Sequence, residues 1–440
     1  MSELLEIAKQ AVSLALKKGA NDASATASRS RDVEIGWRDG KVEKVSEATT
    51  RGLSIALYVD GRYSAVSTSD LRPDALDRFV EEAIAMAKTL AKDPARGLAD
   101  PKLYAGRPKD DLQLADPAYG EYTADMRRAR AKDLEDAARA VPGSASILSV
   151  STNVSDSSSQ SARVTSNGFE GEREGTSFWL SASVSCKDGD GRRPEASNSA
   201  GSRFWKDLPA AAEVGALATR RTLDTLGAKK IESAVLPIIV ENRVAGRLVG
   251  ALLGPLGGRA LQQKQSFLEG QLGKTIGNKL LTVTDDPLIV RGFGSRLYDG
   301  DGIAARKMPV FEAGVLKSYY IDVYYGRKLQ VAPTTGSSSN LVIPPGKKSL
   351  AELLKDTKEA VLVTGFLGGN SNSTTGDFSF GIQGFRVRKG ERAEAIVEMN
   401  ISGNQKDLWK KLSAIGSDPW PYSSVRTPSL VFDGIQIAGL

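Results

Sequence analysis

The chain has 440 residues, of which 25% are charged, and a net charge of +6 from 59 basic and 53 acidic residues. A chain of this length exceeds the size at which one hydrophobic core stops growing, so two or three domains are expected. The small excess of positive charge is spread along the chain. It therefore argues against direct binding of nucleic acid or of a membrane surface.

The sequence contains no histidine and a single cysteine, Cys186. The absence of histidine excludes imidazole bases, serine–histidine pairs and zinc sites built on histidine. A lone cysteine forms no internal disulfide, which favours a reducing compartment. No apolar run approaches the ~20 residues that span a bilayer, and the amphipathic first helix does not resemble a signal peptide. We therefore expect a cytoplasmic protein.

The pattern over residues 1–230 predicts an α+β region of two blocks, 1–92 and 123–226. Each block has a helix, antiparallel strands and a second helix. Asp39-Gly40 and Asp60-Gly61 are strong hairpin signals. The strands are expected at 22–30, 32–37, 41–48, 145–155, 159–167 and 175–187, and a hairpin with its turn at Asp60-Gly61 is expected over 53–67. The connecting residues, 93–122, are rich in Pro, Gly and Asp and indicate an extended linker or surface loop.

Residues 231–440 predict a second, β-rich domain. A buried strand near 234–240 precedes a small-residue helix at 241–254. Many short strands with glycine at their corners follow, and this pattern is typical of a closed, barrel-like antiparallel sheet. The expected fold class is therefore α+β, with a helix and antiparallel-sheet part followed by a β-rich, barrel-like domain.

Three stretches of this domain carry a family resemblance: GNSNSTTGDFSFGIQGFRVRKGE, EMNISGNQKDLW and PSLVFDGIQIAG. Together with SFLEGQLG, which begins at Ser266, they resemble the TldD/PmbA family, also called modulators of DNA gyrase. The resemblance covers most of residues 235–440. It implies a place in a metallopeptidase family that degrades or processes unfolded or short peptides.

The resemblance also directs attention to the helix at 241–254. TldD-type members carry an H-E-x-x-x-H element there, which holds zinc. The matching window here is Val249, Gly250, Ala251, Leu252, Leu253 and Gly254, and no residue in it can bind a metal or relay a proton. The resemblance therefore implies the PmbA/TldE branch. Such a chain would bind no cofactor itself, and zinc is expected in a TldD-type partner. No catalytic residue is assigned.

Polar residues decorate the glycine-rich strands of residues 362–404. Amides and hydroxyls beside strand edges suit an extended peptide bound by strand addition. The alternative is that they are turn and cap residues, with glycine needed only for corners. The predicted peptide-binding residues are Gly365, Asn370, Thr375, Asp377, Ser379, Gly381, Asn400 and Asn404.

The resulting expectation is a non-metal subunit that completes the peptide chamber of a TldD-type zinc peptidase, or that forms a homodimer. Two alternatives remain open. One is an interaction protein that modulates DNA gyrase or another target without proteolysis. The other is an autonomous peptidase that uses carboxylates such as Asp285, Asp286 and Asp377, or serine and lysine. Asp285-Asp286 and the turn at 298–302 could in principle bind a hard cation, but their spacing fails the EF-hand pattern and aspartate–glycine turns explain them better.

Overall fold

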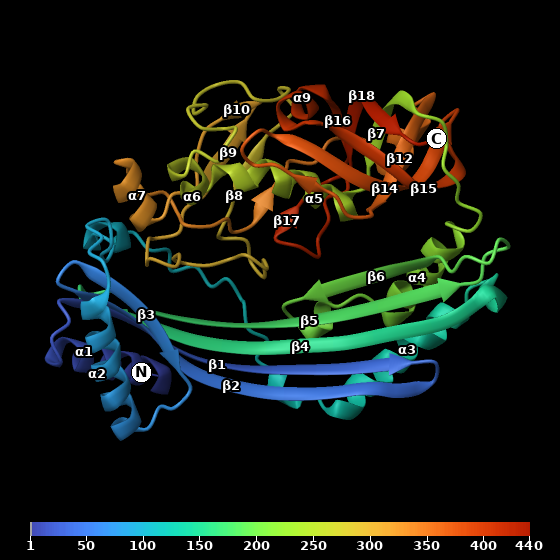
Figure 1. Ribbon diagram of the computed structural model, residues 1–440. Coiled ribbons are helices and arrows are strands. Elements are labelled where there is room, and N and C mark those ends of the chain that lie inside the picture. Colours follow the sequence, from blue (N-terminus) through green and yellow to red (C-terminus); the bar gives the residue numbers. More distant parts are fainter. Residues whose placement is uncertain (1) are drawn as a thin grey trace.

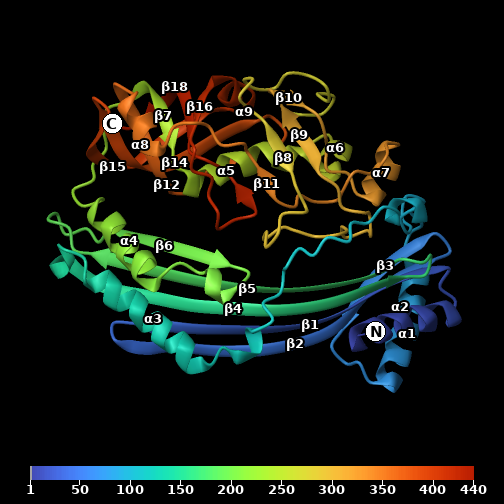
Figure 2. The same ribbon diagram turned by 180° about the vertical axis from the view of Figure 1, so that it is seen from behind.

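The computed structural model describes residues 2–440 (Figures 1 and 2). A long six-stranded antiparallel sheet separates two layers. Helices of the first 230 residues cover one face, and the β-rich C-terminal domain lies over the other (Figure 1). This α+β architecture confirms the predicted fold class. Within residues 2–440, no helix is both long and apolar enough to cross a bilayer.

Both predicted N-terminal blocks contribute to the same sheet, whose strand order is β3-β2-β1-β4-β5-β6. The first block comprises α1 (Glu3–Lys17), β1 (Asp22–Arg38), β2 (Lys41–Val59), β3 (Arg62–Thr68) and α2 (Pro73–Thr89). The second comprises α3 (Ala124–Arg139), β4 (Ile147–Thr165), β5 (Glu170–Cys186), β6 (Glu195–Ser202) and α4 (Ala211–Leu223). The blocks meet where β1 pairs with β4 over its full length.

The N-terminal strands are longer and fewer than the sequence predicted. β1 runs unbroken through the expected 22–30 and 32–37 segments, and β4 joins the two segments near 145–155 and 159–167. The polar residues at these breaks weaken the apolar alternation. They do not end the strands, because each strand has a hydrogen-bonded neighbour on both sides.

The two predicted hairpin turns are confirmed. Asp39 and Gly40 have φ of 47° and 81°, and Asp60 and Gly61 have φ of 49° and 77°. Two consecutive residues with positive φ give the turn whose twist matches the flanking strands.

Small residues set the packing beneath α1. Its buried Ala8, Ala11 and Ala15 lie in one apolar cluster with Ala23 and Ala25 of β1. Because alanine side chains are short, the helix packs closely on the sheet. In β1 these alanines occupy odd positions, so odd positions face the helices.

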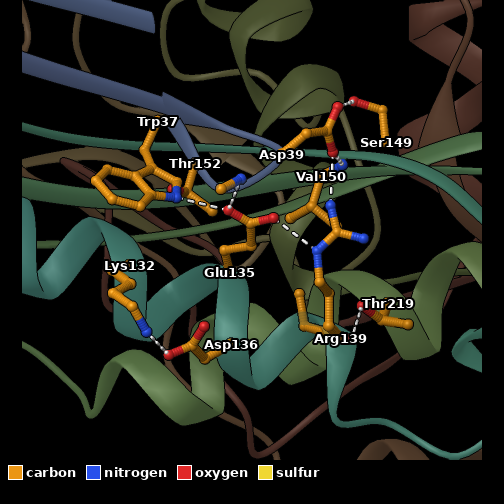
Figure 3. A network of polar contacts seen from close by, with 12 residues as sticks. Trp37, Asp39, Lys132, Glu135, Asp136, Arg139, Ser149, Val150, Thr152 and Thr219 are labelled. Carbon is orange, nitrogen blue, oxygen red and sulfur yellow. Dashed lines mark hydrogen bonds and ion pairs between the residues drawn. The ribbon is translucent and has the colours of Figure 1, made fainter. Parts of the chain in front are cut away.

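A polar network joins the two blocks at the tip of the first hairpin (Figure 3). Glu135 of α3 is buried and accepts hydrogen bonds from Trp37 Nε1 at 2.6 Å and Gly40 N at 2.9 Å. Arg139 of α3 donates to Glu135 at 2.6 Å and to Asp39 at 2.6 Å. The second block therefore holds the hairpin of the first in place.

The C-terminal domain contains a closed five-stranded barrel, in which β12-β7-β18-β15-β14 are neighbours and β14 pairs again with β12. Its strands are β7 (Ala234–Val240), β12 (Glu359–Phe366), β14 (Asp377–Arg388), β15 (Glu391–Asn404) and β18 (Leu430–Ala438). The short β13 (Asn370–Ser371) and β16 (Leu412–Ile415) extend it. A Cβ at Gly384 would lie 1.8 Å from the Leu362 carbonyl oxygen, so the closure of the barrel requires glycine there.

A second, five-stranded sheet packs beside the barrel in the order β10-β9-β8-β11-β17. Its strands are β8 (Val283–Asp285), β9 (Met308–Glu312), β10 (Val315–Leu316), β11 (Leu341–Val342) and β17 (Val425–Arg426). The helices of this domain are α5 (Asn242–Leu253), α6 (Gly258–Gln262), α7 (Val323–Leu329), α8 (Leu350–Lys355) and α9 (Gln405–Leu408). One large apolar cluster unites α5, the barrel and this second sheet.

Candidate functional site

Helix α5 carries the window that the sequence compared with a metal-binding element. Val249 and Leu252 have no exposed surface and lie in the apolar core, whereas Gly250 is exposed. No atom lies within 4 Å of the position that a Cβ of Gly250 would occupy. Gly254 follows the helix, and Ala251 and Leu253 are half-buried against the core. The window therefore presents aliphatic carbon inward and bare backbone outward.

Zinc, the metal that the family implies, does not fit the side chains of this chain. The sequence contains no histidine, and its one thiol, Cys186, is buried in an apolar cluster. Within residues 2–440 there is no group of three or more histidine, cysteine or acidic residues arranged to hold a metal. Zinc prefers four ligands of these types, and the described side chains offer no such set.

The carboxylates considered for independent catalysis have structural partners. Asp285 is 3% exposed and accepts hydrogen bonds from Tyr320 Oη at 2.9 Å and from Ser339 N at 3.0 Å. Asp286 pairs with Lys307 at 3.2 Å. Asp299 accepts from the amide of Ile303 at 3.0 Å within its own turn. Asp285 therefore ties strand β8 to residues 320 and 339, and Asp299 stabilises its own turn.

The structure brings several predicted peptide-binding residues together at one end of the barrel. Asp377 of β14 accepts hydrogen bonds from Thr375 Oγ1 at 2.7 Å and from Asn404 Nδ2 at 2.8 Å. These bonds, that from Thr375 first, lower the pKa of Asp377. Asn400 Nδ2 donates to Ser379 Oγ at 3.1 Å on the same two strands. Two small polar clusters therefore span β14 and β15.

The other predicted residues lie around these clusters. Asn370 is exposed in β13, opposite Ser379. Gly381 lies opposite Asn400, and Gly365 marks a bulge in β12 opposite Gln383. Asn404 lines a cavity of about 390 Å³. The loop before β14 also reaches the metal window, because Ser373 Oγ lies 3.7 Å from the Cβ position of Gly254.

A polar cleft lies between the long sheet and the C-terminal domain, and the sequence did not predict it. It has a volume of about 450 Å³ and is lined by hydroxyl groups of β1, β2 and β4, by residues 110–114 and by residues 295–298. The sheet contributes the hydroxyls of Ser28, Ser30, Thr50, Ser159 and Ser161, and the C-terminal domain contributes Ser295 and Tyr298. A second hollow of about 300 Å³ continues along the sheet past Ser155, Ser157 and Ser177. The side chains on the sheet face opposite the helices are therefore small and polar, and many of them carry hydroxyl groups.

Arginines at the cleft connect the two domains. Arg203 donates to the Phe293 carbonyl at 2.7 Å, and Arg173 donates to the Asp299 carbonyl at 3.1 Å. Arg173 also stacks 4.1 Å from the centre of the Tyr298 ring. Burial lowers the pKa of both arginines. The guanidinium groups of Arg173 and Arg203 are already bonded to carbonyl groups of the C-terminal domain. These two arginines therefore hold the N-terminal sheet and the C-terminal domain in place relative to each other.

The segment 93–122 is also part of this junction and is more than the extended surface loop that the sequence predicted. Arg96 lies between the rings of Tyr63 and Tyr324, at 4.4 and 3.7 Å from their centroids. Further along, the Leu114 carbonyl accepts a hydrogen bond from Thr176 N of β5 at 2.9 Å. The segment therefore contacts both domains along its length.

The start of α5 is fixed against the N-terminal region. Arg221 of α4 forms two hydrogen bonds of 2.8 Å with Glu241, which precedes α5. Arg243 of α5 donates to Asn198 of β6 at 2.5 Å. Burial, together with the charge of Arg221, lowers the pKa of Arg243 to about 10. These contacts place the underside of the barrel domain, with α5, over the long sheet (Figure 2).

These features define a class of α+β protein in which a small barrel domain faces a long sheet across a polar cleft. Three family models match the chain: PmbA/TldA metallopeptidase domain 1 over residues 23–87, the central domain over 118–226 and the C-terminal domain over 233–439. Metalloprotease PmbA of Escherichia coli O157:H7 is 31% identical, over 99% of this chain and 96% of the relative. The chain belongs to the PmbA/TldD metallopeptidase family.

Solved structures agree with this assignment. A modulator of DNA gyrase from Bacteroides thetaiotaomicron VPI-5482 is 38% identical and covers 100% of both chains, with a TM-score of 0.97. TldE from Thermococcus kodakarensis has the same fold at 20% identity, with a TM-score of 0.85 over 98% of this chain and 100% of that one.

Proposed function

We propose that this chain is the subunit without a catalytic metal in a two-chain peptidase. The observation that carries the proposal is the window in α5, where Val249 and Leu252 belong to the core and Gly250 presents no side chain. A TldD-type partner would supply zinc and the hydrolytic step. This chain would supply part of the wall that encloses an unfolded or short peptide. A homodimer would form where the partner is absent, and both would be cytoplasmic.

The residues of this chain would bind and orient the substrate. The polar clusters around Asp377 and Asn400 lie beside the loop that contacts Gly254, at the end of α5. Their amides and hydroxyls suit the main-chain groups of an extended peptide, which offer the same donors and acceptors whatever the sequence. The hydroxyl-rich cleft would extend this polar wall. We assign no proton transfer to this chain.

Reconstitution tests the subunit assignment. The purified chain, a TldD-type chain and their mixture are each incubated with an unfolded peptide, and the products are followed by mass spectrometry. Zinc is measured by atomic emission in each sample. We expect no hydrolysis by this chain alone, hydrolysis by the mixture, and loss of that activity with a chelator. Hydrolysis by the pure chain that survives the chelator would contradict the proposal.

A variant tests the peptide-binding residues within the active mixture. Asp377→Ala removes the carboxylate that accepts from Thr375 and Asn404. We expect KM for the peptide to rise about threefold to tenfold with kcat little changed, because a ground-state contact is lost. Asp356→Ala is the matched control, since Asp356 pairs with Lys348 on the exposed surface of α8. Equal kinetics for the two variants would remove Asp377 from the peptide site.

A further inference from the structure

A further cavity lies on the N-terminal sheet, opposite the polar cleft, with which it shares strand residues that include Arg29, Gln160 and Glu174. It has a volume of about 710 Å³ and lies between the first turn of α1 and strands β1, β2, β4 and β5. Except for Arg173, which reaches into the polar cleft, the charged side chains on its floor project from the helix-covered face. This direction is fixed because Arg51 contacts Glu3, and Glu172 contacts Ser2, at the start of α1. The cavity therefore opens on the face opposite the polar cleft.

A row of charged and amide side chains crosses this floor. Arg51 lies directly opposite Arg29, Arg29 opposite Gln160, and Gln160 opposite Glu174, on the adjacent strands β2, β1, β4 and β5. The row is therefore cationic at one end, amide in the middle and anionic at the other end. Like charges directly opposite each other destabilise a sheet, so the Arg29–Arg51 pair costs stability unless an anion lies between them.

Three members of this row differ from the charged residues around them. Within residues 2–440, Arg29, Gln160 and Glu174 make no side-chain hydrogen bond or ion pair. The fourth member, Arg51, pairs with Glu3 at 2.6 Å, and the nearby Arg31 pairs with Glu47 at 2.8 Å. An exposed charge alone needs only water. Here an unpaired cation and an unpaired anion face one cavity at a fixed spacing.

We propose that this cavity binds a short peptide with free termini. Arg29, next to Arg51, would hold the α-carboxylate in the planar, two-pronged geometry that guanidinium favours. Glu174 would accept hydrogen bonds from the α-ammonium group, and Gln160 can both donate to and accept from a peptide bond between them. The site lies on the other face of the sheet, so it does not depend on the proposed function.

The spacing sets the length of the ligand. Arg29 and Glu174 lie two strand intervals apart, which is about 9.5 Å at the usual separation of strands. Three extended residues span about 10 Å, so a tripeptide matches the row. A free amino acid is too short to reach both charges. The cavity has room for three small residues. The site would therefore distinguish peptides by their length and their free termini more than by their side chains.

Calorimetric titration of the intact chain tests the proposal. The probes are trialanine and its analogues with an acetylated amino terminus or an amidated carboxyl terminus. We expect saturable binding of trialanine, weakened about tenfold by either cap, because each cap removes one charge-assisted contact. No detectable binding of trialanine, or equal binding of all three peptides, would overturn the proposal.

Two substitutions assign the ends of the ligand. R29Q should weaken trialanine about tenfold and leave the affinity for the amidated peptide unchanged, because that peptide already lacks the carboxylate. E174Q should likewise weaken trialanine about tenfold and leave the affinity for the acetylated peptide unchanged, because that peptide already lacks the ammonium group. R128Q is the matched control, since Arg128 pairs with exposed Asp125 on α3. Circular dichroism verifies folding. Affinities for trialanine that are the same in R29Q, E174Q and R128Q would overturn the proposal.

Discussion

The N-terminal sheet and the C-terminal barrel are stabilised by different kinds of interaction. The sheet unites two blocks of chain, and buried charges fix the helix α3 on it: Glu135 bonds to the hairpin of the first block, and Arg127 pairs with Asp156 of β4. The barrel closes on itself, and its strands pack into two apolar clusters, the larger of which includes Trp409 and Phe380. Two separate blocks can dock in many orientations, so directional polar bonds are needed to select one orientation. A closed barrel depends mainly on filling its core with apolar side chains and on glycine where its strands bend.

The largest effect is expected from the buried ion pair of the N-terminal region. Arg127 Nε and Asp156 Oδ2 are 2.5 Å apart, and both side chains are at most 1% exposed. Asp156→Ala would leave a guanidinium group buried without its partner and should cost about 3–5 kcal/mol of unfolding free energy. Urea denaturation followed by circular dichroism measures the loss.

A double variant serves as the control for this pair. R127M/D156L replaces both charges with apolar side chains and should be about as stable as the unmodified chain. A D156A variant as stable as the unmodified chain would show that the pair does not hold α3 on the sheet.

The barrel side of the comparison is tested at α5. Leu252 has no exposed surface, so Leu252→Ala should cost about 2–5 kcal/mol through lost burial and the cavity that remains. Gly250→Ala, two residues away, should instead stabilise the chain by up to about 1 kcal/mol, because its Cβ enters open space within a helix. Urea denaturation of both variants measures the two changes in unfolding free energy. A costly Gly250→Ala would mean that this face of α5 is covered.

The sequence predicted features that depend on neighbouring residues. Asp39-Gly40 and Asp60-Gly61 were recognised as hairpins because the turn requires those residue types. The window at 249–254 was placed on a helix, and a helix is present. The pairing of β1 with β4 was not predicted, because it joins residues more than 100 positions apart and no local pattern encodes it.

Two other features were missed for reasons that lie in their composition. Strand β6, Glu195–Ser202, contains only small and polar residues, so it lacks the large apolar alternation that indicates a strand. The serines of the polar cleft did carry a signal, because Ser155, Ser157, Ser159 and Ser161 recur with period two. They mark one face of β4, and that regularity was hidden when β4 was divided into two segments.

A smaller effect is expected from the network that pins the first hairpin to α3 (Figure 3). Glu135→Ala removes the acceptor of Trp37, Gly40 and Arg139 and should cost about 1–3 kcal/mol. Asp136→Ala, at the adjacent position, breaks only the exposed pair with Lys132 and should change stability by less than about 0.5 kcal/mol. Thermal unfolding compares the two. Similar losses would show that the network does not fix the blocks.

The smallest effect is a pH dependence at Asp39. Partial burial opposes its ionisation, but hydrogen bonds from Val150 N and Ser149 and the charge of Arg139 lower the pKa of Asp39 overall. A lowered pKa means that the fold favours the carboxylate. The stability gained is therefore complete above the unfolded pKa, about 3.9, and is lost as the pH falls through the folded value.

Asp39→Asn should consequently destabilise the chain at neutral pH and progressively less in acid, as measured by urea midpoints. Ser149→Ala keeps the carboxylate while removing one of its hydrogen bonds, so it should retain part of the pH dependence. A constant difference between Asp39→Asn and the unmodified chain at every pH would show that this carboxylate does not help to hold the hairpin.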